Sequence, residues 1–196
     1  MNILLLAALM ASPTPAQTAS PAAPQARLAW PANPAARLAA QREAMKALAF
    51  MDGTWRGPAK AEEAPAGLTQ TERVGDLLGG SVKLVEGRGY DGAGRTVFNA
   101  FAIISYDPVK QAYLMRSHAM GYAADFPLTV SPDGFSWTRP EGPGASTRYT
   151  TTIKGGEWHE IGERIVGDKP PVKTFEMRLR RLGATAWPLG EPVPPG

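Results

Sequence analysis

Short runs in which apolar and polar residues alternate follow one another along most of the chain. A period of two is typical of strands that bury one face, and Gly, Pro and Asp clusters separate the runs. About ten strands are therefore expected, with no helix between them. The predicted strands are Thr54–Lys60, Leu68–Val74, Ser81–Tyr90, Arg95–Tyr106, Gln111–Met120, Pro127–Val130, Phe135–Arg139, Ser146–Ile153, Glu157–Val166 and Val172–Leu182.

One helix is predicted, before the first strand. Asn33 is a residue type that caps helix N-termini, and Pro34 suits the first helical position. Strong helix formers fill Ala35 to Met51, and Asp52-Gly53 ends the pattern. The apolar positions expected on one face are Leu38, Met45, Leu48 and Ala49.

Tight turns between successive strands predict an antiparallel meander, and Asp91-Gly92-Ala93-Gly94 is a strong hairpin signal. Closing such a sheet removes its exposed edges. The expected fold is mostly β: an antiparallel up-and-down β-barrel of about ten strands with one N-terminal α-helix plugging one end. The helix and barrel together form one domain, residues 34–182.

The flanking segments have other compositions. Residues 1–19 hold a short apolar run followed by small residues and prolines, which is typical of a signal peptide with a cleavage site before Gln17. Residues 20–33 have the Pro/Ala-rich composition of a linker, and residues 183–196 are expected to form an irregular tail. We therefore expect a periplasmic or secreted protein after signal-peptide removal.

Charge and composition narrow the possible partners. The 196 residues carry a formal net charge of +3, with basic and acidic residues interspersed. Such a surface does not favour nucleic acid, whose partners usually carry a basic stripe. No later stretch is long and apolar enough for membrane insertion as a helix. The chain has no cysteine, which excludes disulfides and thiolate metal sites.

Several motifs resemble those of known families. Gly53-Thr54-Trp55 after a helix is similar to the G-x-W pattern of the lipocalins, and hence to the calycin architecture. The chain also resembles the bacterial family called domain of unknown function 1579, over roughly Leu38 to Arg181. That resemblance implies a barrel without an established activity, and it is carried by Phe50 to Trp55, Gly79-Gly80, Tyr106-Asp107-Pro108 and Phe175-Glu176-Met177-Arg178-Leu179.

Two further implications come from resemblance. In lipocalins the tryptophan lies under an arginine of the last strand, which here implies Arg180 first and Arg181 second as partners of Trp55. The haem-binding nitrobindin-type barrels are similar in outline. Their haem-ligating histidine lies late in the chain, and only His159 could match it.

Candidate chemistry lies along the strands. Arg116 and His118 share one face of their strand, and Tyr113 lies on the opposite face. Facing inward, the pair would suit an anion; facing outward, it would be a solvated pair. His159 could join His118 and Glu163 in a metal site, or it could lie on the surface among charged neighbours.

Aromatic residues such as Trp137 and Tyr149 recur along the strands and would either line an apolar cavity or fill the barrel core. The candidate ligand-binding residues are Arg116, His118, Tyr113, Trp137, Tyr149 and His159.

Enzyme signatures such as a nucleophile elbow or a phosphate loop are absent from the sequence. We therefore expect a non-catalytic barrel that binds a small, partly apolar ligand in its lumen. If Arg116 and His118 face inward, this ligand would carry an anionic group. The barrel needs no cofactor. The alternatives are a haem- or metal-binding barrel that uses His118 or His159, and a structural or interaction module with a filled barrel. The sequence leaves the oligomeric state open.

Overall fold

The structure is a computed structural model that describes residues 33–62, 64 and 66–185. The chain divides into Met1–Pro31 and Ala32–Gly196, and the described residues belong to the second unit. The predicted signal peptide, most of the linker and the tail beyond residue 185 lie outside the described residues. Among the helices that are described, none has the length and apolar character needed to cross a bilayer.

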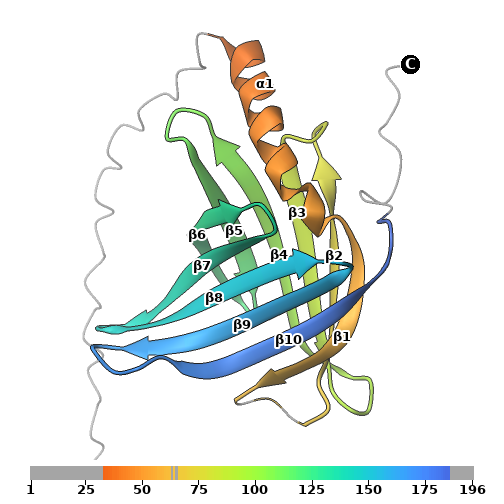
Figure 1. Cartoon of the computed structure of the whole chain (residues 1–196), viewed down its shortest axis with the longest axis vertical. Coiled ribbons are helices and arrows are strands. Elements are labelled where there is room, and N and C mark those ends of the chain that lie inside the picture. Colours follow the sequence, from red (N-terminus) through yellow and green to blue (C-terminus); the bar gives the residue numbers. More distant parts are fainter. Residues whose placement is uncertain (1–32, 63, 65, 186–196) are drawn as a thin grey trace, which may run out of the picture. The chain divides into compact units, whose positions relative to one another are not determined.

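Ten antiparallel strands form a closed barrel, as the alternating pattern predicts. Each strand pairs with the next along the chain, and β1 closes the ring by pairing with β10 (Figure 1). The strands are β1 Gly53–Ala61, β2 Thr69–Leu77, β3 Val82–Tyr90, β4 Thr96–Asp107, β5 Ala112–Ala119, β6 Tyr122–Ser131, β7 Gly134–Gly142, β8 Ala145–Lys154, β9 Glu157–Val166 and β10 Val172–Gly183.

The helical segment has two parts. An α-helix, α1, spans Pro34–Met45, and Asn33 caps it by accepting a hydrogen bond from the Ala36 N–H at 3.0 Å. A 3-10 helix, η1, then spans Lys46–Met51. The buried residues of this region are Met45, Leu48 and Met51, spaced three apart.

A 3-10 helix has three residues per turn, so this spacing places all three side chains on one side. The prediction of a continuous α-helix through Met51 was therefore wrong at its end. Leu38 and Ala49, which were expected on the buried face, are exposed. Leu38 lies on α1, which extends away from the barrel (Figure 1), while Ala49 lies on η1 between the buried Leu48 and Met51.

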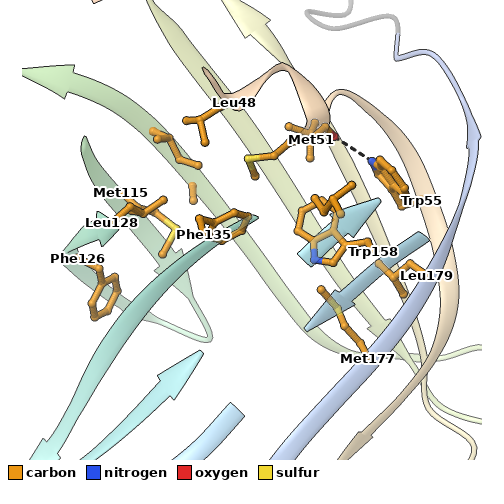
Figure 2. Packing of buried hydrophobic residues seen from close by; sticks show 14 of the residues in the cluster. Leu48, Met51, Trp55, Met115, Phe126, Leu128, Phe135, Trp158, Met177 and Leu179 are labelled. Atoms are coloured by element: carbon orange, nitrogen blue, oxygen red, sulfur yellow. Dashed lines mark hydrogen bonds between the residues drawn. The ribbon is translucent and has the colours of Figure 1, made fainter. Parts of the chain in front are cut away.

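The 3-10 helix covers one end of the barrel, here called the closed end. Leu48 and Met51 pack there with apolar residues of the strands, and Trp55 lies beside them (Figure 2). The Trp55 indole N–H donates to the Met51 carbonyl at 2.9 Å, and its ring meets Trp158 edge-on at 5.7 Å. The remaining buried apolar residues of this core include Val74, Ile104, Met115, Leu128, Phe135, Ile153 and Leu179.

Of the two arginines implied by the lipocalin resemblance, Arg181 stands opposite Trp55 in the strand ladder. Arg181 donates from Nε to the Asp52 carbonyl at 3.1 Å. Arg180 pairs with Arg56 and points to the outer face, where it meets Glu157. Strand alternation explains the difference, since the inward residues of β10 are the odd-numbered ones at this end.

A buried lysine forms ion pairs at the closed end. Lys83 of β3 contacts the carboxylates of Asp52 and Asp76, the latter at 2.6 Å. Asp52 follows η1 directly, while Asp76 stands opposite Lys83 on β2. The ion pairs therefore hold the end of the helical segment against the β2–β3 hairpin.

The opposite end is here called the open end. The strands β6 and β7 pair only through Thr129–Ser131 and Gly134–Ser136, and then diverge (Figure 1). Near this end even inward-facing residues are exposed: Phe98 is 37% exposed, and Ala124 and Arg139 are also exposed. Solvent therefore reaches the inner wall of the barrel from the open end.

Candidate functional site

Two carboxyl groups are buried in the barrel wall and face the lumen. Glu72 of β2 accepts a hydrogen bond from the Gln70 side-chain amide at 2.7 Å. Glu160 of β9 accepts one from the Thr151 hydroxyl of β8 at 2.5 Å. Gln70, Glu72, Thr151 and Glu160, here called the lumen acid cluster, are all buried. The partners of both carboxyls are thus neutral groups.

Burial raises the pKa of both acids. It raises the pKa of Glu72 to about 8, and the charges of Glu160 and Glu86 raise it further, against the lowering by the Gln70 amide. Burial likewise raises the pKa of Glu160, against the lowering by Thr151 and by the neighbouring Trp158 N–H. At neutral pH the cluster therefore holds at least one protonated carboxyl, which can donate a hydrogen bond.

A glycine makes room for the Glu72 carboxyl. Gly87 of β3 stands opposite Glu72 in the ladder. A Cβ atom on Gly87 would lie 2.9 Å from one carboxyl oxygen of Glu72 and 3.0 Å from the other. A side chain at this position would therefore push the Glu72 carboxyl away from this backbone.

Aromatic rings line the wall beside the cluster. Trp137 and Tyr149 are stacked, with ring centres 4.3 Å apart and planes 11° apart. Phe126 meets Trp137 at 4.9 Å, and Phe175 meets Tyr149 at 6.0 Å. Gly162 gives the Tyr149 ring its place, because a Cβ there would lie 2.9 Å from it. These rings offer flat apolar surface next to buried polar groups, the combination typical of small-molecule sites.

Beyond the aromatic rings, an ionic network lies at the open end. Glu141 accepts from Thr147 at 2.5 Å, from Arg139 at 2.6 Å and from Arg164 at 2.9 Å. Hydrogen bonds from Thr147 and then Arg139 hold the pKa of Glu141 at about 2. Both arginines are therefore bound to a carboxylate that stays ionised.

Three of the predicted ligand-binding residues face the lumen. Trp137 and Tyr149 belong to the aromatic wall described above. Tyr113 faces inward nearer the closed end, where its hydroxyl donates to the Ala44 carbonyl at 2.7 Å. Tyr113 is therefore engaged in holding α1 and lies apart from the lumen acid cluster.

Arg116 and His118 face outward, so the alternative in which this pair faces the lumen is wrong. Alternation along β5 puts Met115 and Ser117 inside and these two residues outside. Arg116 forms a bidentate pair with Asp125 of β6, at 2.7 Å for both contacts. His118 borders a hollow of about 610 Å³, most of whose lining residues face outward: Glu86, Arg88, Thr96, Asn99, Ala100, Phe101, His118, Ala119, Met120, Gly121, Tyr122 and Ala123.

His159 also faces outward, and its Nε2 lies 3.0 Å from the Glu176 carboxylate. Because His118 and His159 both point away from the lumen, neither fits as the ligand of a haem held inside the barrel. His118, His159 and Glu163 do not form a three-ligand site, and no cluster of three such residues able to hold a metal occurs within residues 33–62, 64 and 66–185.

Sequence reasoning missed most of the lumen acid cluster, although the pattern contained a signal. Gln70 and Glu72 alternate with Thr71 and Arg73, so they share the face of Leu68 and Val74. Polar residues between apolar ones on a single strand face indicate a buried polar site. Glu160 shares a face with Trp158 in the same way.

Comparisons with known proteins establish the fold only. No family model matches the chain, and no curated protein matches its sequence. Among solved structures, the chain is similar to Rv2717c from M. tuberculosis, with a TM-score of 0.51 and 13% identity. The match covers 70% of this chain and 96% of that one. The class defined by fold and site is thus a ten-stranded antiparallel barrel with an acid cluster in its wall. The resemblance to the domain of unknown function 1579 family stays a prediction.

Proposed function

We propose that the protein is a non-catalytic binder of a small, partly apolar molecule, held in the barrel lumen between the closed-end core and the open end. The observation that carries this proposal is the lumen acid cluster. Two carboxyls without a cationic partner are costly to bury, and a barrel that served only as a scaffold would gain stability from apolar residues there. The adjoining aromatic wall supplies the apolar surface that such a ligand would cover.

The exposure of inward residues supports this proposal over the alternative of a filled barrel. At the closed end Leu48, Met51 and Trp55 pack tightly, whereas inward residues at the open end reach solvent. The anionic version of the ligand rested on Arg116 and His118, which lie on the outer face. It therefore has no support from the lumen.

The location of the site can be tested with neighbouring alanines of β6. Ala124 faces the lumen and Ala123 faces outward, and both are exposed. Ala124→Trp should fill the open end without disturbing the buried core, while Ala123→Trp is a matched control. The protein is purified without denaturation from its own compartment, and retained small molecules are identified by native mass spectrometry.

A molecule retained by the wild type and by Ala123→Trp, but lost from Ala124→Trp, would support the proposal. Loss from Ala123→Trp alone would place binding in the outer hollow and contradict a lumen site. If the wild type retains nothing and no compound of a small-molecule panel raises its melting temperature, the binding function itself is refuted.

We also propose that the protein acts in the periplasm or outside the cell, which rests on the composition of residues 1–19. N-terminal sequencing of the protein isolated from cells should find a start at or near Gln17. A start at Met1 would contradict export by signal-peptide cleavage.

A further inference from the structure

The lumen acid cluster lacks a counter-ion in the described part of the chain. The amide of Gln70 and the hydroxyl of Thr151 are the hydrogen-bond donors to Glu72 and Glu160. A cation placed near both carboxyls would allow them to ionise together.

The charged groups around the cluster are committed elsewhere. Arg139 and Arg164 are held by Glu141 at the open end. Glu86 acts on Glu72 from the outer face, where it is paired with Arg73 and Arg88.

The other elements at this level add little charge. The phenol of Tyr149 stays neutral, because burial raises its pKa above its usual range. The residues opposite the two acids in the strand ladders are not ionisable. Trp55 and Gly87 flank Glu72, while Thr151 and Met177 flank Glu160. No protein cation in this described region therefore neutralises the pair.

A second observation points to an incomplete site. Trp158 is 2% exposed, and its indole nitrogen is buried without a partner in hydrogen-bond geometry. This N–H lies beside Glu160, whose pKa it lowers. In Figure 2 the nitrogen lies on the side of the ring away from Trp55. An ionised Glu160 would be a strong acceptor for this N–H, so ionisation of the cluster would also satisfy a buried donor.

The aromatic wall suits the same kind of ligand. The rings of Trp137 and Tyr149 offer faces on which a flat apolar body can stack. Aromatic faces also attract organic cations. The apolar wall and the acids are next to each other, since the charge of Glu160 acts on Tyr149.

From this arrangement we propose that the lumen ligand is an organic amine with a flat apolar body. Its ammonium group lies between Glu72 and Glu160, and its body lies along Trp137 and Tyr149. On binding, the carboxyls release protons to solvent as the ammonium replaces them. This inference rests on the proposed function and specifies the ligand class for the same site.

Three probes with one aromatic body test the charge preference: naphthylmethylamine, naphthylmethanol and naphthoate. Affinities are measured by titration calorimetry on the full chain at pH 6 and pH 8, where the amine stays protonated. We expect the amine to bind at least about tenfold more tightly than the alcohol. Its affinity should rise from pH 6 to pH 8, because fewer protons then have to leave the cluster.

Substitutions locate the effect. Glu72→Gln and Glu160→Gln should each reduce the amine affinity at least about tenfold and leave the alcohol affinity nearly unchanged. Glu163→Gln is the matched control, since Glu163 lies on β9 but faces outward and pairs with Arg148. It should change neither affinity.

The outcomes separate the two proposals. If the alcohol or naphthoate binds as tightly as the amine, the amine inference is wrong while lumen binding stands. If the amine binds but the glutamine variants have no effect, the placement of its ammonium is wrong. If no probe binds and no retained molecule is found, the proposed function fails together with the inference.

Discussion

Replacing Glu72 with glutamine should make the protein more stable at neutral pH. Glutamine keeps the shape of the side chain and can still accept from Gln70, but it has no charge to bury. The pKa of Glu72 rises from an ordinary value of 4.5 to about 8 on folding. Below pH 4.5 both the folded and the unfolded state hold the proton, so wild type and Glu72→Gln should have similar free energies of unfolding.

Between pH 4.5 and about pH 8 the folded wild type keeps the proton and the unfolded chain has lost it. Wild-type stability then falls with rising pH by about 1.4 kcal/mol per pH unit. The advantage of Glu72→Gln should grow to about 3 kcal/mol at pH 7 and level off at about 4–5 kcal/mol above pH 8.

Urea denaturation at pH 5, 6, 7 and 8, followed by tryptophan fluorescence, measures this difference. Glu163→Gln, on the outer face, should follow the wild-type pH dependence. A constant gap between Glu72→Gln and wild type across this range would refute the raised pKa. A stability difference that grows toward low pH would show that folding lowers the pKa of Glu72.

Three further predictions concern the frame of the barrel. Trp55→Ala removes a buried ring from the closed-end core and should cost about 3–5 kcal/mol of unfolding free energy. Lys83→Met keeps the apolar stem of a side chain that is 1% exposed but leaves Asp52 and Asp76 unpaired. These two carboxylates are 35% and 48% exposed and can be hydrated, so the loss of unfolding free energy should be about 2–3 kcal/mol. Gly87→Ala would press a methyl group against the Glu72 carboxyl and should cost about 1–3 kcal/mol. Urea denaturation measures all three.

Each of these has its own control or contrary result. A Trp55→Ala protein as stable as wild type would show that the ring does not belong to the core. Lys173→Met breaks an exposed pair with Glu176 and should cost less than about 1 kcal/mol; an equal cost for Lys83→Met would contradict its role at the closed end. Gly92→Ala has open space around the new methyl group, so it should be nearly neutral, and equal effects at Gly87 and Gly92 would remove the steric argument.

Local patterns sufficed for the strands. Alternation placed nine of the ten strands within three residues of their bounds, and Asn33-Pro34 marked the helix start. The prediction Pro127–Val130 missed the first five residues of β6, which begins at Tyr122. Closure by pairing of β1 with β10 followed from the meander, since unpaired edges are costly. The 3-10 helix was not foreseen, because the depth to which Met45, Leu48 and Met51 insert depends on the barrel end they meet.

The sequence by itself determined which residues of a strand share a face, since alternation is a property of the local backbone. It could not say which face turns inward on β5, because Arg116 and His118 alternate with Tyr113, Met115 and Ser117 and both faces carry polar groups. The register with neighbouring strands decided this, and it placed Arg116 and His118 outside. The tertiary structure alone also brought Glu72 of β2 within electrostatic reach of Glu160 of β9. Their pKa values depend on burial by strands distant in the sequence, and no local pattern contains that information.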